Sequence, residues 1–151
     1  MTMRLRELTI RYSRASDPEG CPLLIDHAVR RAGDAAPALL KLLQHEAAEV
    51  FVILCLSTKC RVLGYHEVSR GTLDATLVHP REVFKVALLA NAATIVLAHN
   101  HPSGDPSPSP DDIALTHRLV KTGEIVGVHV VDHIIVGDGR WTSLHDCGLL
   151  R

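Results

Sequence analysis

Apolar residues recur along the chain at strand and helix spacing and divide it into short elements. Residues 50–56 are apolar throughout, as in a strand covered on both faces, and a turn leads from them to a second strand over residues 61–69. Helices are expected from Pro80 and over residues 110–122, because proline is favoured in the first helical turn and apolar residues follow at helical spacing. Three further strands are expected over residues 94–99, 127–136 and 141–144. The order β-β-α-β-α-β-β predicts a mixed α/β fold, with a central mixed β-sheet flanked by helices.

The first 46 residues are less regular. Alternating apolar and polar residues predict a short strand near residues 8–12. Two short helices are expected over residues 23–31 and 37–45, separated at Gly33 and Asp34. The chain is therefore divided into an N-terminal segment of residues 1–46 and a main domain of residues 47–151.

Composition and charge argue against several classes of protein. The chain is 46% hydrophobic and 22% charged, which is typical of soluble globular domains. A net charge of −1 argues against a partner held mainly by bulk electrostatics, such as a nucleic-acid backbone or a membrane surface. The apolar runs are too short to cross a bilayer, and residues 1–12 lack the apolar stretch of a secretory signal. The four cysteines form no C-x-x-C pair and Cys55 lies in an apolar run, so we expect a reducing, cytoplasmic environment.

The candidate chemistry lies in the histidines. The chain has ten of them, and His99 and His101 are two residues apart at the end of a predicted strand, so both side chains project to one face. Asp112 can supply a third ligand once the proline-rich loop after His101 folds back over the strand end. Catalytic zinc typically binds three protein ligands and one water molecule. The spacing therefore predicts one zinc ion per chain.

Hydrolysis at such a site also needs a general base and a group that stabilises the oxyanion. Glu67, on the predicted 61–69 strand, is the candidate base, and the hydroxyl of Ser109 is the candidate oxyanion donor. Each has another interpretation: Glu67 as a solvated strand residue, and Ser109 with Asp112 as the N-terminal cap of a helix. His133 and Ser103 are candidates for supporting the metal ligands from outside the metal's own shell.

Taken together, these motifs resemble the JAMM metallopeptidase signature of the MPN fold. That signature combines a glutamate, an H-x-H pair and an S-x-x-D segment. The local sequence is similar to the bacterial RadC family over roughly residues 49–150, in H-E-V-S-R-G-T at 66–72, H-P-R-E-V at 79–83, A-H-N-H-P-S-G-D-P at 98–106 and D-H at 132–133. The resemblance implies an MPN/JAMM fold and a zinc-dependent metallopeptidase that hydrolyses a peptide or isopeptide bond. It also implies zinc ligation by His99, His101 and Asp112, acid/base catalysis by Glu67, and stabilisation of the tetrahedral intermediate by Ser109.

The alternative function is a nucleic-acid-binding protein of DNA repair or of mobile elements. RadC proteins carry a historical DNA-repair label, but residues 1–46 are too short for the helix-hairpin-helix-like region that usually precedes the MPN domain. The remaining support is a local excess of basic residues at Arg4, Arg6, Arg11 and Arg14. The predicted partner is therefore a peptide or protein substrate, with DNA as the alternative and no membrane partner; the oligomeric state is left open.

Overall fold

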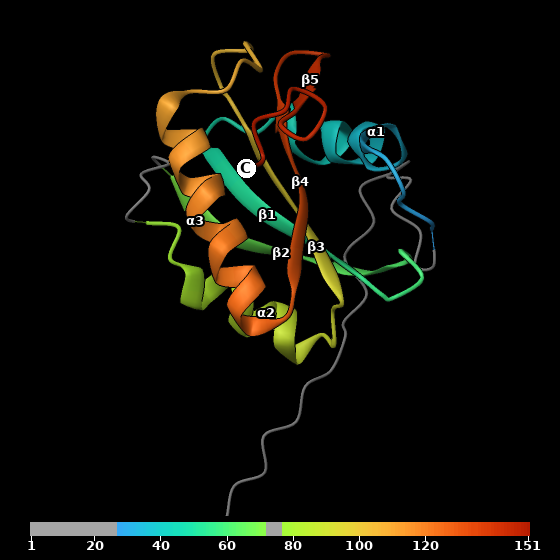
Figure 1. Cartoon of the computed structure of the whole chain (residues 1–151). Coiled ribbons are helices and arrows are strands. Elements are labelled where there is room, and N and C mark those ends of the chain that lie inside the picture. The colour runs from blue at the N-terminus through green and yellow to red at the C-terminus, as the bar shows by residue number, and fades with distance from the viewer. Residues whose placement is uncertain (1–26, 72–76) are drawn as a thin grey trace, which may run out of the picture.

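The structure is a computed structural model that describes residues 27–71 and 77–151 (Figure 1). Its elements are α1 (Ala32–Leu43), β1 (Glu49–Leu56), β2 (Val62–Gly71), α2 (Pro80–Leu89), β3 (Thr94–Asn100), α3 (Pro110–Val126), β4 (His129–Val136) and β5 (Trp141–Ser143). The predicted order of strands and helices after residue 47 is confirmed. The strand predicted near residues 8–12 lies outside the described residues.

The five strands form one mixed sheet in the order β2-β1-β3-β4-β5. β1 is antiparallel to both β2 and β3, β3 and β4 are parallel, and β5 is antiparallel to β4. The parallel pair is connected through α3, because parallel neighbours need a crossover connection. This architecture agrees with the MPN/JAMM fold that the sequence resemblance implies.

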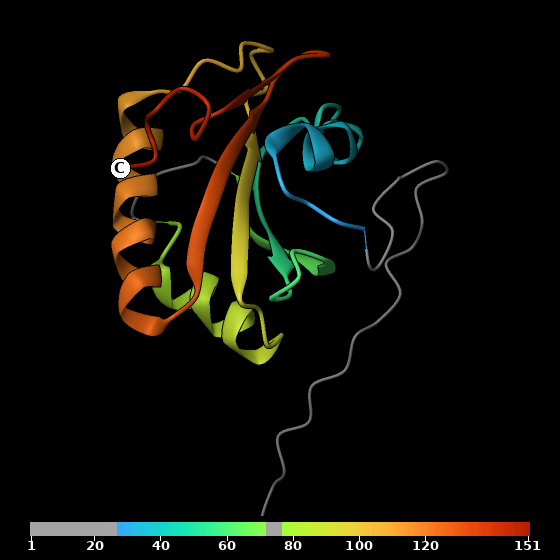
Figure 2. The same cartoon turned by 45° about the vertical axis from the view of Figure 1, so that its right-hand side comes forward.

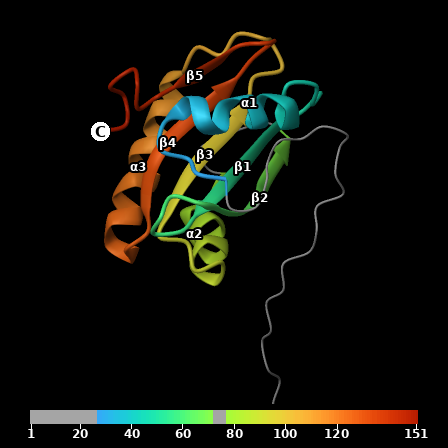
Figure 3. The same cartoon turned by 90° about the vertical axis from the view of Figure 1, so that its right-hand side faces the viewer.

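Helices cover both faces of the sheet, with α1 on one side and α2 and α3 on the other (Figures 2 and 3). Side chains of β1 alternate between the two cores: Val52 and Leu54 pack toward α1, whereas Phe51 and Ile53 pack toward α2 and α3. A strand buried on both faces must be apolar at every position, which explains the uninterrupted apolar run over residues 50–56. Because side chains alternate along a strand, only every second polar residue at the strand ends lies on the face covered by α3.

The N-terminal helices differ from the sequence prediction. Of residues 27–46, which the structure describes, Ala32–Leu43 form one helix, α1, and residues 27–31 precede it without helical structure. Asp34 lies in its first turn and accepts hydrogen bonds from the backbone N–H groups of Arg30 and Arg31, so it caps the helix where a break was predicted. Pro37 lies inside the helix, exposed, rather than at its start. The predicted boundary after residue 46 stays a prediction, and α1 packs on the sheet of the main domain.

Two predictions about the environment of the chain can be compared with the structure. Within residues 27–71 and 77–151, no helix combines the length and the apolar character needed to cross a membrane. Three of the cysteines, Cys55, Cys60 and Cys147, are free thiols, and burial raises the pKa of Cys55 to about 11. Cys21 lies outside the described residues, and the cytoplasmic environment stays a prediction.

Candidate metal centre

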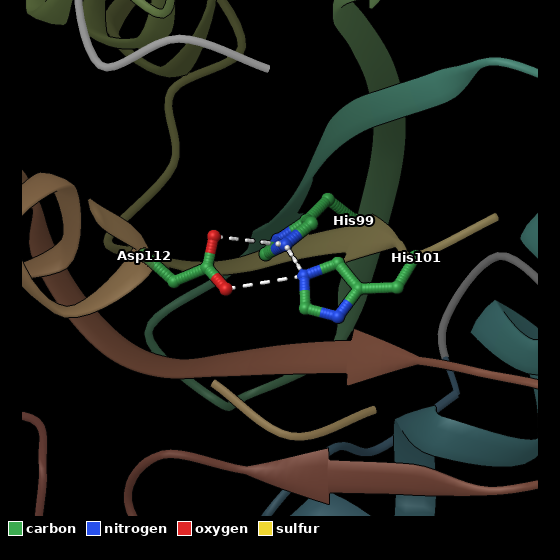
Figure 4. A group of neighbouring side chains, drawn as sticks. All are labelled: His99, His101 and Asp112. Atoms are coloured by element: carbon green, nitrogen blue, oxygen red, sulfur yellow. Dashed lines mark hydrogen bonds and ion pairs between the residues drawn. The ribbon is translucent and has the colours of Figure 1, made fainter. Parts of the chain in front are cut away.

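The three predicted metal ligands meet at the end of β3 (Figure 4). Nε2 of His99 lies 3.0 Å from Nε2 of His101 and 3.2 Å from Oδ1 of Asp112, and Nε2 of His101 lies 3.1 Å from Oδ2 of Asp112. One ligand atom from each residue therefore fits within 4.8 Å of the others. The His99 and Asp112 side chains are almost fully buried, while His101 is 16% exposed and lies in the wall of a pocket of about 420 Å³. The cluster is thus closed on the protein side and open toward this pocket.

The loop that carries Asp112 to the histidines is docked on the turn between β4 and β5. The backbone N–H of Asp138 donates to the carbonyl oxygen of Gly104 at 2.9 Å. A Cβ atom at Gly137 would lie 2.3 Å from the same oxygen, so only glycine allows the two segments to approach. This contact folds the proline-rich loop back over the strand end and places the first turn of α3 beside it.

The ring of His101 is oriented by a backbone carbonyl. Its Nδ1 lies 2.8 Å from the carbonyl oxygen of Asp105, and because a carbonyl only accepts, Nδ1 must carry the proton. In the neutral ring, Nε2 then presents its lone pair to His99 and Asp112, as a metal ligand must. Ser103 lies in the pocket wall and accepts from the Asp105 N–H at 3.4 Å, so it supports this loop rather than bonding to a ligand.

His99 is held by aromatic packing and by a second histidine. Its ring stacks on Phe51, with centroids 6.0 Å apart and planes inclined by 15°. Its Nδ1 lies 2.7 Å from Nε2 of His133, which is fully buried on β4. The structure therefore places His133 in direct contact with a predicted ligand, on the side away from the pocket.

The electrostatics of the cluster favour a positive charge. Burial alone would raise the pKa of Asp112, but hydrogen bonds from His101 and His99 lower it far below its ordinary value, so the carboxylate is ionised. The hydrogen bond to Asp112 in turn raises the pKa of His101, against the opposing effect of burial. Two imidazole nitrogens only 3.0 Å apart also need a proton or a metal ion between their lone pairs. The donor set of two imidazoles and one carboxylate therefore fits a divalent metal ion such as zinc.

His133 predicts a measurable pH dependence of stability. Burial lowers the pKa of His133 well below 6.5, so the folded state keeps this ring neutral while the unfolded chain protonates it. Stability is therefore lost as the pH falls below the unfolded value, by at most about 1.4 kcal/mol per pH unit. Urea unfolding of the metal-free protein between pH 7 and pH 5 should show a shallower loss for His133→Gln than for wild type. Equal slopes for the two proteins would contradict a neutral, buried His133.

Ser109 fits both of its predicted interpretations. It is the N-cap of α3: its hydroxyl oxygen accepts from the Asp112 N–H at 3.1 Å, and its own N–H donates to Oδ2 of Asp112 at 2.8 Å. Ser109 also lines the pocket beside His101. The cap uses the hydroxyl as an acceptor, which leaves the O–H proton to donate toward the pocket.

Glu67 lies away from the cluster. In β2 it pairs with Val52, whose side chain packs toward α1, whereas His99 stacks on Phe51 on the opposite face of the sheet. The Glu67 side chain is 42% exposed, and its carboxylate bonds Nη2 of Arg70 at 2.6 Å. The structure therefore places Glu67 on the face of the sheet opposite the cluster, where a surface strand residue would lie, and its acid/base role stays a prediction.

Glu49, at the start of β1, is one of two acidic residues outside the ligand set that line the pocket; the other is Asp111. Phe51 lies opposite His99 in the antiparallel pair, and continuing this register by two residues places Glu49 opposite His101. Glu49 lines the same pocket as His101. The charge of Glu49 also raises the pKa of His101, as the smallest contribution after those of Asp112 and the Asp105 carbonyl. The sequence offered one signal that was missed, an acidic residue immediately before a strand buried on both faces.

Asn100 fixes the segment around Glu49 from the opposite face of the sheet. Its Oδ1 accepts from the N–H of Val50 at 2.7 Å, and its Nδ2 donates to the carbonyl oxygens of Ala48 at 3.0 Å and Glu46 at 3.3 Å. The side chain is buried, so these bonds are shielded from water. The residue between the two histidines thus holds the backbone on both sides of Glu49.

Comparisons with known proteins cover most of the chain. A family model described as the RadC-like JAB domain matches residues 29–149. The chain is 51% identical over 122 residues to a UPF0758 protein of Moorella thermoacetica, which covers 81% of this chain and 53% of that protein. It is 50% identical over 109 residues to a UPF0758 protein of Methanosarcina barkeri, covering 72% of this chain and 48% of the relative. A relative from Desulfitobacterium hafniense is 44% identical over 140 residues, 93% of this chain and 60% of its own length. The chain therefore spans about half the length of the curated relatives that it matches.

Proposed function

Because the chain belongs to the RadC-like JAB domain family, and because its His-His-Asp cluster opens on a pocket, we propose that it is a zinc-dependent metallopeptidase. It would hydrolyse a peptide or isopeptide bond of a peptide or protein substrate. The observation that carries the proposal is the meeting of three ligand atoms within 4.8 Å, at a pocket that Glu49 and Ser109 also line. The names of the relatives state no activity, so the reaction is inferred from the site.

The residues of the pocket suit the roles that such a reaction needs. His99, His101 and Asp112 would hold the ion, whose chemistry is to polarise a carbonyl and to make water more acidic. Glu49 would accept the proton of the attacking water and return it to the leaving amine, because it lines the pocket together with His101. Ser109 would donate its O–H to the carbonyl oxygen as negative charge develops there.

The proposal is tested by incubating the zinc-loaded protein with libraries of peptides and isopeptide-linked peptides and analysing the products by mass spectrometry. We expect cleavage at defined bonds, lost on chelation and restored by zinc. Cleavage that persists in protein shown by elemental analysis to be free of metal would contradict a metal-dependent hydrolase.

Ser109→Ala is expected to keep its zinc and to lose only part of its activity. One oxyanion donor contributes about 10²–10³ in rate, and loss of a helix cap costs about 1 kcal/mol of stability. The matched control is His79→Ala, because His79 caps α2 through the Arg81 N–H without lining the pocket. If Ser109→Ala only lowers the melting temperature, as the control should, then Ser109 is a helix cap without a role in hydrolysis.

The nucleic-acid alternative stays a prediction, since the four arginines that suggested it lie outside the described residues. Titration of the full chain with duplex DNA at several salt concentrations measures it directly. Binding through phosphate contacts weakens steeply as salt is added.

A further inference from the structure

A closed ring of buried polar groups lies behind His99, on the side away from the pocket. Nδ1 of His99 lies 2.7 Å from Nε2 of His133, and Nδ1 of His133 lies 2.6 Å from the hydroxyl of Thr116. That hydroxyl donates to the carbonyl oxygen of Asp112 at 2.6 Å, and the Asp112 carboxylate returns to Nε2 of His99 at 3.2 Å. His99, His133 and Thr116 have no exposed surface, so water does not supply alternative partners.

While His133 is neutral, the donor and the acceptor of each hydrogen bond from Thr116 through His133 to His99 are fixed. The carbonyl of Asp112 only accepts, so the Thr116 hydroxyl donates its single proton to it. The same hydroxyl must therefore accept from Nδ1–H of His133. Nε2 of His133 then carries a lone pair and accepts from Nδ1–H of His99. In a neutral His99 ring, Nε2 is then left with a lone pair that faces Asp112 and His101, where either an added proton or a metal ion can bind.

Burial supports the neutral state of His133 that this direction requires. The ring has no exposed surface, and its two nitrogens contact an imidazole and a hydroxyl rather than a carboxylate, so it carries a single proton. Which nitrogen of a histidine binds a metal is set by the hydrogen bond that the other nitrogen makes. A ring with a fixed direction therefore decides the tautomer of His99 before any ion arrives.

We propose that Thr116 and His133 are positioning residues that fix His99 in the tautomer with Nε2 free for the metal. The hydroxyl of Thr116 sets this order, because it bonds both the backbone carbonyl of Asp112 and the ring of His133 without supplying a ligand atom to the metal site. This inference rests on the metal site proposed above and extends it to two residues that do not touch the ion.

The chain offers matched variants for a test by zinc affinity. Thr116→Val keeps the shape of the side chain and removes the hydroxyl, while Thr116→Ser retains the hydroxyl. Thr122→Val is the control, because Thr122 also donates to the carbonyl four residues earlier on α3 but contacts no histidine ring. Chelator competition on the full chain should show zinc bound about 10–100-fold more weakly by Thr116→Val. Thr116→Ser and Thr122→Val should stay close to wild type, and wild-type affinity in Thr116→Val would overturn the proposal.

Nitrogen NMR of the histidine rings provides a second measurement that needs no metal. In the metal-free wild type, long-range ¹H–¹⁵N spectra should show His99 protonated at Nδ1, and Thr116→Val should show a mixture of tautomers. A wild-type His99 protonated only at Nε2 would overturn the proposal. Failure of the wild type to bind zinc would instead contradict the proposed function, so the two failures are distinguishable.

Discussion

Replacing His99 with alanine is expected to abolish zinc binding. The imidazole is fully buried between Phe51 and His133, and its removal leaves two ligands where catalytic zinc usually has three. His101→Ala should have the same effect. Elemental analysis of the purified proteins should find about one zinc ion per wild-type chain, the stoichiometry of a single catalytic site, and almost none in these variants.

Asp112 requires a variant that separates ligation from capping. Asp112→Asn keeps an oxygen that can accept from the N–H of Ser109, so α3 should still begin correctly, but the neutral amide is a much poorer zinc ligand. The control is His129→Ala, an exposed histidine at the start of β4. Zinc content equal to wild type in His99→Ala, His101→Ala and Asp112→Asn would rule out this cluster as the metal site. Occupancy should also fall in acid, since protons compete for the same imidazole nitrogens.

The second large effect is expected from a pair of glutamates on opposite faces of the sheet. Glu49→Gln keeps the volume of the side chain but removes the group that accepts a proton, so turnover should fall by about 10²–10⁴ while zinc is retained. Glu67→Gln is the matched control: the same chemical change, in a residue paired with Arg70 and facing away from the pocket, should leave turnover unchanged.

Three outcomes would change this assignment. Equal turnover of Glu49→Gln and wild type, on a substrate found by the library screen, would show that Glu49 is not the base. Loss of turnover in Glu67→Gln alone would restore the assignment made from the sequence. Loss of zinc in Glu49→Gln would make Glu49 a ligand of the ion.

The sequence predicted the parts of the fold and site that depend on local periodicity. Uninterrupted apolar residues identify β1, and the two-residue spacing of His99 and His101 places both rings on one face, because side chains alternate in a strand. Asp112 could be added because the loop between it and His101 is rich in proline and is followed by a helix start. These inferences need only neighbouring residues.

The position of Glu67 relative to the cluster could not be predicted, because it depends on the register between strands. Glu67 and Glu49 both border apolar strand residues, and a shift in the β1–β2 pairing between Phe51 and Val52 decides which side of the sheet each position of β2 faces. No periodicity in a single strand encodes that shift. The role of Thr116 could not be predicted either, because its contact with His133 joins residues that are 17 positions apart in the chain.

The hydrogen bonds from Asn100 to the backbone around Glu49 limit where insertions and deletions can be tolerated in this chain. His99 and His101 lie on one face of β3, while the side chain of Asn100, on the other face, bonds the backbone on both sides of Glu49. Inserting or deleting one residue within β1 would turn Glu49 to the wrong face and move Val50 away from its amide partner. Insertions and deletions in homologous chains should therefore collect in the turns, such as residues 57–61 and 137–140, and be absent from β1 and from residues 94–101. In an alignment of homologous chains, the segments without insertions or deletions should therefore mark the position of the site, even where its polar residues have been replaced.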